Sequence, residues 1–435
     1  MVKYRAGPGG AAAGELVVPG DKSISHRALM LGGIAHGVTD ITGFLAGEDC
    51  LATLRALQSL GVRIERPEDQ HVIVHGVGPK GLRGAAKPLD MGNAGTAMRL
   101  SMGLLAPQNF NSTLIGDESL MRRPMERVGA PLRLMGANIQ TQNGKPPVEI
   151  TGSTQMHGID YSLPVASAQV KSAILLAGLQ ASGVTRVTEP APTRDHTERM
   201  LRAFGVNVLQ HGPTASIEGG QTLRGTQITV PADFSSAAFF LVAGCLAAEK
   251  PLLLRNVGVN PTRTGLLQLL LQMGADIKVH AHPASRSDAE PIADIEVRKS
   301  RLKGIQVAED LVPLSIDEFP VFFIAAACAE GETLVRGAEE LRVKETDRLA
   351  AMADGLTALG VENQLHPDGI GIRGGDGFAG GTVDSRGDHR IAMAFAVASL
   401  RARGPVEILD VANVATSFPG FVEIARTAGL RIETA

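Results

Sequence analysis

The sequence predicts an α/β protein of two domains, built from six copies of a βαβαββ unit. Three observations support this class. The chain has 435 residues, which suffices for two or three domains of roughly 150 residues each. A motif of the form LGV plus a strand recurs about every 70 residues. Ahead of each copy, small and polar residues lead into a helix that is apolar nearly all round, which is typical of a buried helix.

The LGV motif ends the second helix of each unit. In LQSLGVRIE, LRAFGVNVL and ARTAGLRIE a helical stretch runs to a glycine, and a strand pattern follows. Glycine is favoured at this position because it adopts the left-handed conformation that ends many helices. The six glycines are Gly61, Gly136, Gly205, Gly274, Gly360 and Gly429.

The first helix of each unit is the buried one. The six segments that begin it are GDKSISHRALMLGGIA from Gly20, GNAGTAMRLSMGLLA from Gly92, ASAQVKSAILLAGL from Ala166, ADFSSAAFFLVAGCLA from Ala232, SIDEFPVFFIAAACA from Ser315 and GDHRIAMAFAVASL from Gly387. We expect Ser, Thr, Asp or Asn near each start to cap the helix by accepting from its free N–H groups. A strand, a second helix and two short strands then complete the unit.

The domain boundaries follow from an incomplete last unit. The closing hairpin occurs five times, and the chain ends at RIETA before a sixth. The opening segment has the missing strand character, so we expect residues 1–20 to complete the last unit. The predicted domains are therefore residues 1–20 plus 232–435, and residues 21–231, with three units in each.

Composition excludes several classes of protein. The net charge is −3 without a long block of one sign, which argues against nucleic-acid or membrane-surface partners. Trp is absent and only two Tyr occur, which argues against base-stacking platforms. Cys50, Cys245 and Cys328 are too few and too far apart for a disulfide framework. With neither a membrane-length apolar run nor a signal peptide, the sequence predicts a soluble cytoplasmic protein.

Motifs for a cofactor or a metal are weak. Two GxGxxG matches, at 76–81 and 369–374, fall in the closing hairpins, where a dinucleotide motif would need a helix to follow. Two histidine pairs, His71 with His75 and His280 with His282, lack a third ligand. We therefore expect no cofactor and no metal.

Cations and hydrogen-bonding side chains gather around the starts of the buried helices. Free N–H groups and the positive end of the helix dipole favour anions there. Any one of these residues could merely cap a helix or face solvent, but their recurrence in equivalent repeat positions favours a polyanionic small substrate. They are Lys22, Ser23, Arg27, Asn93, Thr96, Arg123, Ser167, Gln169, Arg194, Lys344, Arg348 and Arg390.

Ten motifs in a fixed order resemble those of the 5-enolpyruvylshikimate-3-phosphate synthase family. They are GDKSISHR (20–27), GNAGTAMR (92–99), RPMER (123–127), SAQVK (167–171), TRDHTE (193–198), NPTR (260–263), IDEFP (316–320), RVKETDR (342–348), DHRIAM (388–393) and TSFPGF (416–421). The resemblance covers about residues 14–430, and the RPMxR, SAQxK and NxTR forms resemble the second bacterial class. It implies a two-domain inside-out α/β barrel with three βαβαββ repeats per domain, which agrees with the repeat count.

The resemblance also implies an activity. A 3-phosphoshikimate 1-carboxyvinyltransferase transfers the enolpyruvyl group of phosphoenolpyruvate to the 5-hydroxyl of shikimate 3-phosphate and releases phosphate, in the pathway to chorismate and aromatic amino acids. Both substrates are anions, which explains the need for many cations. We expect a monomer that binds these two small molecules, without a cofactor.

Carried over by motif, the resemblance assigns three sets of residues. The shikimate 3-phosphate set is Lys22, Ser23, Arg27, Ser167, Ala168, Gln169, Arg194, Asp317 and Lys344. The phosphoenolpyruvate set is Lys22, Asn93, Gly95, Thr96, Arg123, Gln169, Arg348 and Arg390. The catalytic set is Asp317, Glu345 and Lys22.

The reaction is an addition followed by an elimination, so two protons must move. Asp317 is the expected base for the 5-hydroxyl, and Glu345 the expected proton carrier at C3 of the enol. Lys22 and Lys344 would tune both by charge. The residues alone also allow a plain reading, in which Asp317 caps a helix and Glu345 pairs with Arg348 on a helix surface.

Two positions depart from parts of the family pattern. Thr416 stands where some members carry Lys, which removes a candidate cation for phosphoenolpyruvate. Gly95 stands where certain second-class enzymes carry Ala, which crowds the inhibitor glyphosate. We therefore expect glyphosate to enter this site.

Two alternatives stay open from the sequence. One is UDP-N-acetylglucosamine enolpyruvyl transferase, which has the same fold but typically a Cys before the RP motif; residues 111–125 contain none. The other is a non-catalytic scaffold of this fold that binds anions.

Overall fold

The computed structural model describes residues 2–283 and 289–435, and its contacts divide these residues into two compact units. Unit 1 comprises residues 2–19, 231–283 and 291–435. Unit 2 comprises residues 20–230 together with 289–290. Each unit has its own hydrophobic core.

Unit 2 alternates helices and strands. Its helices are α1 (Lys22–Gly33), α2 (Glu48–Ser59), α3 (Gly95–Leu105), η1 (Leu120–Arg122), α4 (Glu126–Leu134), α5 (Ala168–Gly178) and α6 (His196–Ala203). Its strands are β3 (His36–Thr42), β4 (Arg63–Glu68), β5 (His71–Val77), β6 (Leu89–Asp90), β7 (Ser112–Ile115), β8 (Asn138–Gln142), β9 (Lys145–Thr151), β10 (Asp160–Ser162), β11 (Val184–Thr188), β12 (Val208–His211), β13 (Thr214–Glu218) and β14 (Gln227–Thr229).

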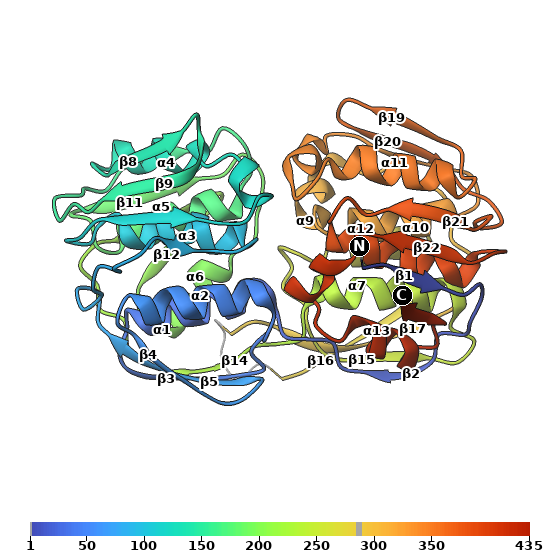
Figure 1. Cartoon of the computed structure of the whole chain (residues 1–435), viewed down its shortest axis with the longest axis horizontal. Helices are drawn as coiled ribbons and strands as arrows, with labels where there is room; N and C mark the ends of the chain where they lie inside the picture. Colours follow the sequence, from blue (N-terminus) through green and yellow to red (C-terminus); the bar gives the residue numbers. More distant parts are fainter. Residues whose placement is uncertain (1, 284–288) are drawn as a thin grey trace. The chain divides into compact units, whose positions relative to one another are not determined.

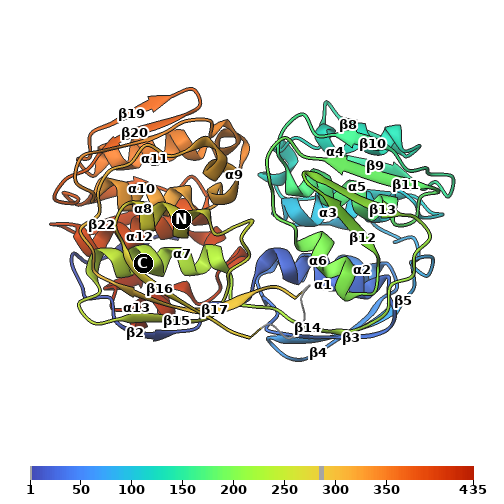
Figure 2. The same cartoon turned by 180° about the vertical axis from the view of Figure 1, so that it is seen from behind.

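The strands of unit 2 form three sheets of the same pattern, ordered β14-β3-β5-β4, β6-β7-β9-β8 and β10-β11-β13-β12. In each sheet the first pair is parallel and the other pairs are antiparallel. The strands lie around α1, α3 and α5, with α3 packed against both other helices (Figure 1, Figure 2). Helices that are apolar nearly all round need this interior position, because every face is then covered.

Unit 1 repeats the arrangement. Its helices are α7 (Phe234–Ala247), α8 (Gly265–Gln272), η2 (Glu309–Leu311), α9 (Val312–Ser315), α10 (Phe319–Ala327), η3 (Glu339–Val343), α11 (Arg348–Ala358), α12 (His389–Ala398), η4 (Ser399–Arg401), η5 (Ala412–Thr416) and α13 (Phe421–Thr427). Its strands are β1 (Tyr4–Ala6), β2 (Gly14–Leu16), β15 (Leu252–Gly258), β16 (Asp276–Ala281), β17 (Ile292–Arg298), β18 (Glu332–Val335), β19 (Asn363–His366), β20 (Gly369–Arg373), β21 (Gly381–Asp384), β22 (Val406–Leu409) and β23 (Ile432–Thr434).

The three sheets of unit 1 are ordered β16-β17-β15-β2, β21-β22-β1-β23 and β18-β20-β19. The third has one strand fewer, because the segment before α10 makes only isolated bridges, from Lys303 to Glu330 and from Gln306 to Leu334. Helices α7, α10 and α12 pack against one another, and every residue of each is buried. The predicted fold of six βαβαββ units with buried helices is thus confirmed, with this one shortened sheet.

Strands near the domain boundaries pair away from their sequence neighbours. Strand β2 pairs with β15 of unit 1, although the chain continues from it into α1 of unit 2. Strand β14 pairs with β3 of unit 2, although α7 of unit 1 follows it. Strand β1 lies between β22 and β23 and pairs antiparallel with both. The first residues of the chain therefore share a sheet with the last strand.

The caps of the buried helices differ in part from expectation. Asp21, Ser167, Asp233 and Asp388 each accept a backbone N–H at the start of their helix. The prediction is wrong for α3 and α10, whose N-cap residues, Ala94 and Glu318, make no side-chain cap bond. The polar residues expected there, Asn93 and Asp317, bind arginines instead.

None of the helices within residues 2–283 and 289–435 combines the length and apolar character that a bilayer crossing requires.

Candidate active site

In unit 2, polar side chains from the starts of α1, α3 and α5 and from the loop before α4 make up what we call the unit 2 cluster: Lys22, Asn93, Arg99, Arg123 and Gln169. Lys22 is the first residue of α1. Its ammonium lies 3.0 Å from Oδ2 of the buried Asp49, in the first turn of α2. The chain thus fixes this lysine at the start of a buried helix.

Arg99 joins α3 to α5. Its Nη1 donates to Oε1 of Gln169 at 2.6 Å, and its Nη2 donates to the carbonyl of Pro124 at 3.1 Å. The amide of Gln169 in turn donates to Oγ1 of Thr96 at 2.9 Å. Arg99 therefore fixes which way the Gln169 amide points.

Arg123 is held beside the start of α3. Its Nη2 donates to Oδ1 of Asn93 at 2.5 Å and to Oγ of Ser119 at 3.3 Å. The Asn93 amide donates to Oδ2 of Asp117 at 2.6 Å, which fixes the orientation of that amide. The side-chain oxygen of Asn93 accepts from Arg123, which explains why it does not cap α3.

The backbone at Gly95 closely approaches two arginines. A Cβ atom at this position would lie 3.0 Å from Nη1 of Arg123 and 3.2 Å from Nη1 of Arg99. Both distances are tight for a carbon atom, so an added methyl group would fit only after each guanidinium had shifted by a few tenths of an ångström.

Arg27 lies one turn further along α1 and is buried. Its three nitrogens donate to Oγ1 of Thr197 at 2.7 Å, the carbonyl of Ser23 at 2.9 Å and Oγ of Ser172 at 2.8 Å. Burial lowers the pKa of its guanidinium to about 10, against the opposing charge of Glu198. Arg27 still carries its positive charge at neutral pH.

A buried ion triad lies behind this region. The Lys171 ammonium is 2.8 Å from Oε1 of Glu189 and 2.8 Å from Oε1 of Glu198. Burial alone would lower the lysine pKa, but the two carboxylates outweigh it and the pKa is raised. Thr193 also donates to Glu189, so the triad ties α5 to α6 and to the loop that carries Arg194.

The remaining candidates of unit 2 lie at the same helix starts. Ser167 caps α5 by accepting from the N–H of Val170 at 3.4 Å, and Ala168 is the first residue of α5. Ser23 follows Lys22 in α1. Arg194 lies near enough to Arg27 for its charge to lower the pKa of that arginine.

In unit 1, a second group gathers around the start of α11: Asp317, Lys344, Glu345, Arg348, Asp388 and Arg390. We call it the unit 1 cluster. At its centre Arg348 has only 1% of its side chain exposed. It donates to Oδ2 of Asp388 at 2.8 Å, to Oε2 of Glu345 at 2.6 Å and to Oδ1 of Asp317 at 3.2 Å. These carboxylates outweigh the effect of burial and raise the pKa of Arg348.

Asp317 also contacts Arg390, the second residue of α12. Nη1 of Arg390 donates to the backbone carbonyl of Asp317 at 3.1 Å, and its Nη2 lies 3.8 Å from the carboxylate. Two arginines thus fix the Asp317 carboxyl group. Asp317 precedes the capping residue of α10 and does not itself cap the helix.

Lys344 sits in the loop between η3 and α11. Its Nζ lies 3.3 Å from Oε1 of Glu340. Burial lowers the pKa of the Lys344 ammonium; the carboxylates of Glu340, Asp317 and Glu345 oppose that shift, and the charge of Arg348 adds to it.

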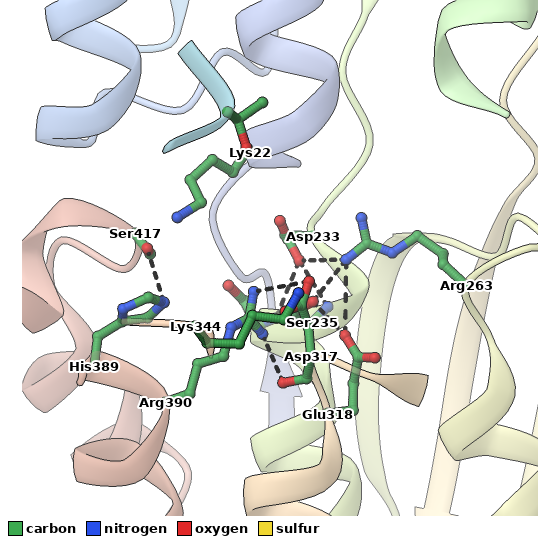
Figure 3. A network of polar contacts seen from close by, with 12 residues as sticks. Lys22, Asp233, Ser235, Arg263, Asp317, Glu318, Lys344, His389, Arg390 and Ser417 are labelled. Atoms are coloured by element: carbon green, nitrogen blue, oxygen red, sulfur yellow. Dashed lines mark hydrogen bonds and ion pairs between the residues drawn. The ribbon is translucent and has the colours of Figure 1, made fainter. Parts of the chain in front are cut away.

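Glu318, the residue after Asp317, belongs to a buried network of hydrogen bonds (Figure 3). Ser235 donates to Glu318, and Arg263 donates to Ser235 at 2.7 Å and to Asp233 at 3.2 Å. Glu318 is 1% exposed and is the N-cap residue of α10. The network therefore joins the start of α7 to the start of α10.

The hydroxyl of Thr416 donates to the carbonyl of Asn413 at 2.7 Å. Among the described contacts, no hydrogen bond joins this hydroxyl to the unit 1 cluster. The neighbouring Ser417 lies 3.1 Å from Nε2 of His389, a buried residue of α12 (Figure 3).

Sequence reasoning missed several residues that the clusters contain. Arg99 and Asp388 lie inside the quoted motifs, yet were not singled out. A signal existed for Arg99, because it is the one charged residue in an otherwise apolar helix, and such a residue needs a buried partner. Asp388 looked like a simple helix cap, and its second role toward Arg348 depends on a contact 40 residues away in sequence.

Within the described residues, no group of three or more His, Cys, Asp or Glu side chains is arranged to hold a metal ion.

The family model of EPSP synthase (3-phosphoshikimate 1-carboxyvinyltransferase) matches residues 7–424. The chain is 58% identical, over 433 residues, to a 3-phosphoshikimate 1-carboxyvinyltransferase of Methylococcus capsulatus, with 99% of this chain and 98% of that protein covered. The chain belongs to the EPSP synthase family. The family's members are enolpyruvyl transferases, and its name describes transfer of a carboxyvinyl group.

Solved structures of the family agree. EPSP synthase of Acinetobacter baumannii is 54% identical, with a TM-score of 0.89 and full coverage of both chains. The enolpyruvyl transferase NikO of Streptomyces tendae is 18% identical, with a TM-score of 0.80 over 100% of this chain and 99% of that one. The second likeness concerns the fold alone.

Proposed function

We propose that this protein transfers the enolpyruvyl group of phosphoenolpyruvate to the 5-hydroxyl of shikimate 3-phosphate, giving 5-enolpyruvylshikimate 3-phosphate and phosphate. The observation that carries this proposal is the near-full-length identity to the Methylococcus capsulatus 3-phosphoshikimate 1-carboxyvinyltransferase. The two clusters supply the cations and carboxylates that such a reaction needs.

The proposed binding residues fall into two sets. For shikimate 3-phosphate they are Lys22, Ser23, Arg27, Ser167, Ala168, Gln169, Arg194, Asp317 and Lys344. For phosphoenolpyruvate they are Lys22, Asn93, Gly95, Thr96, Arg123, Gln169, Arg348 and Arg390. Helix N-termini support both sets, because their free N–H groups favour phosphate and carboxylate.

The chemistry needs one new C–O bond and one broken C–O bond. The 5-hydroxyl oxygen attacks C2 of phosphoenolpyruvate and loses its proton, while C3 gains a proton and becomes a methyl group. The C2–O bond to phosphate then breaks, and C3 returns a proton as the double bond re-forms. The two anionic substrates repel each other when they are bound side by side, and the positive charges of the arginines offset this repulsion.

Asp317 is the proposed base for the hydroxyl. Its carboxylate is held by Arg348 at 3.2 Å, so it points in a fixed direction, as a general base requires. Glu345 is the proposed carrier of the C3 proton, and Arg348 fixes it as well, at 2.6 Å. Lys22 supplies positive charge beside the reacting groups.

We also propose that glyphosate binds in place of phosphoenolpyruvate. The absence of a side chain at Gly95 leaves the space next to Arg123 and Arg99 that a methyl group would take. The protein is expected to be a cytoplasmic monomer, and light scattering should therefore give a mass near 45.5 kDa.

The test measures phosphate release by the purified, metal-free protein. Phosphoenolpyruvate is supplied with shikimate 3-phosphate, alone, or with UDP-N-acetylglucosamine. Release that needs shikimate 3-phosphate supports the proposal. Release only with the UDP-sugar would assign the protein to the sibling reaction, and tight binding of shikimate 3-phosphate without release would favour a non-catalytic scaffold.

A further inference from the structure

The loop between η3 and α11 carries Lys344 and Glu345, and Arg342 is the penultimate residue of η3. We infer that Arg342 is a positioning residue, which holds this loop in the one conformation that the reaction uses. The inference rests on the proposed function, because that function gives Lys344 and Glu345 their roles.

All three nitrogens of the Arg342 guanidinium are engaged, and each has a different acceptor. Nε donates to the carbonyl of Pro367 at 2.7 Å, Nη2 to the carbonyl of His366 at 2.7 Å, and Nη1 to Oδ2 of Asp347 at 2.6 Å. A guanidinium with every nitrogen committed in this way is suited to fixing other groups, not to binding a substrate.

One of these contacts, the ion pair with Asp347, closes the loop. Asp347 is the cap of α11, and its Oδ1 accepts from the N–H of Ala350 at 3.0 Å. Its other oxygen accepts from Arg342. The ion pair therefore joins η3 to the N-cap residue of α11, and residues 343–346 lie between the two paired side chains.

The remaining contacts anchor the loop to the turn between β19 and β20. That turn is itself fixed, because both carboxylate oxygens of Asp368 accept from Nε of Arg336, at 2.8 and 2.9 Å. The N–H of Ala338 also donates to the Asp368 carbonyl at 2.7 Å. Arg342 thus connects the loop to a turn that is itself hydrogen-bonded to the segment between β18 and η3.

Lysine could not replace this arrangement. It has one nitrogen, whereas Arg342 reaches three acceptors with three nitrogens in a fixed plane. The substitution Arg342→Lys keeps the charge and removes most of the connections. Glu345 would then lose its fixed approach to Arg348, now 2.6 Å, and a displacement of about 1 Å at a reacting group can cost on the order of 100-fold in rate.

The experiment compares kcat, the KM for each substrate, the Kd for shikimate 3-phosphate and Tm. For Arg342→Lys we expect kcat to fall about 10- to 100-fold, with the Kd within about twofold and Tm within about 2 °C of the wild type. Arg373→Lys is the matched control, because Arg373 lies on β20 of the same unit and its side chain is 73% exposed. It should leave kcat unchanged.

A second variant, Asp347→Ser, keeps a side chain that can cap α11 and removes the ion pair. We expect kcat to fall here as well. The double variant should be no slower than Arg342→Lys alone, because both substitutions break the same ion pair between residues 342 and 347. If Arg342→Lys cannot be purified, Asp347→Ser decides the question.

Three results would overturn the inference. They are a kcat within twofold of the wild type, a loss of kcat that merely follows a fall in Tm, and additive effects in the double variant. A wild-type protein that releases no phosphate in the same assay contradicts the proposed function instead, so the two failures are distinguishable.

Discussion

The hydrogen bonds described for three buried arginines of unit 2 differ from those of Arg348 at the centre of the unit 1 cluster. In unit 2, the hydrogen bonds described above for Arg27, Arg99 and Arg123 go to uncharged oxygens of serine, threonine, asparagine and glutamine side chains and of the backbone. In unit 1, Arg348 donates to three carboxylates. The same side chain thus serves in two electrostatic settings within one protein.

The difference suggests different tasks. A guanidinium that donates to a neutral oxygen gains electrostatic energy when an arriving anion replaces that acceptor, so the unit 2 cluster is suited to binding. Carboxylates fixed by an arginine have defined positions, so the unit 1 cluster is suited to proton transfer. Substitutions in unit 2 should mainly change KM or Kd, and substitutions in unit 1 should mainly change kcat.

The largest expected effect is at Asp317. Asp317→Asn keeps the size of the side chain and an oxygen for Arg348, but removes the proposed base. We expect kcat to fall about 10³-fold, with the Kd for shikimate 3-phosphate within about threefold, as measured by phosphate release and calorimetry. Asp376→Asn, an exposed position of the same unit, is the control.

Near-normal turnover of Asp317→Asn, or of Asp317→Ala, would remove Asp317 as the base. It would also break the comparison, since the carboxylates of unit 1 would then serve structure alone.

The next effect tests unit 2. Arg99→Leu leaves Oε1 of Gln169 and the Pro124 carbonyl without the donors that now lie 2.6 and 3.1 Å away. The Gln169 amide can then turn away, and we expect kcat/KM for phosphoenolpyruvate to fall about 10- to 100-fold, mostly through KM. Arg122→Leu is the matched control, because the Arg122 side chain is 64% exposed.

A fall in kcat for Arg99→Leu at an unchanged KM would contradict the division of tasks between the two clusters.

Much of the fold was predictable from particular residues. The recurrent glycines and the helices that are apolar all round determine a repeat whose helices must be buried, and the structure confirms it. The caps show the limit of local patterns. Asn93 and Asp317 are good capping residues in the right place, but arginines from other parts of the chain compete for their side chains. Such competition depends on tertiary contacts that a local pattern does not contain.

The site residues were inferred from motifs, and their substrate roles remain predictions. Motifs gave residues of the right charge at helix starts, but not the residues that orient them. Arg99 was overlooked because its two acceptors, Gln169 and the Pro124 carbonyl, lie 70 and 25 residues away in sequence. Arg342 was overlooked for a similar reason, as the turn it binds begins 24 residues later.

A smaller effect is expected at Gly95. In Gly95→Ala the new methyl group would stand 3.0 Å from Nη1 of Arg123, in the space we assign to glyphosate. We expect the inhibitory concentration of glyphosate to rise about 10-fold or more and the KM for phosphoenolpyruvate less than about threefold, because the two ligands differ in bulk. Gly375→Ala is the control, since an added Cβ there would meet no atom within 4 Å.

Equal inhibition of the wild type and Gly95→Ala would reject glyphosate binding at this position. Equal increases in both constants would instead mean that the methyl group displaces Arg123.

The smallest expected effect concerns how much positive charge unit 2 can hold. His26 lies in α1 between Lys22 and Arg27, and its Nδ1 is 2.7 Å from Oγ1 of Thr53. Burial, together with the charges of Lys22 and Arg27, lowers the pKa of His26 from 6.5 to about 3. Below pH 6.5, His26 is therefore protonated in the unfolded chain but not in the folded chain. The free energy of unfolding falls as the pH is lowered, until the pH nears 3.

Between pH 7 and pH 5.5 this linkage should lower the free energy of unfolding by about 1 kcal/mol. In the variant His26→Asn, residue 26 takes up no proton in either state. Its free energy of unfolding, measured in urea, should therefore decrease less than that of the wild type between pH 7 and pH 5.5, whatever its stability at pH 7. His211→Asn, at an exposed histidine of the same unit, should keep the wild-type slope. If His26→Asn and the wild type lose the same amount, the folded protein accepts a third charge beside Lys22 and Arg27. The charges of Lys22 and Arg27 would then not limit how much further positive charge unit 2 accepts.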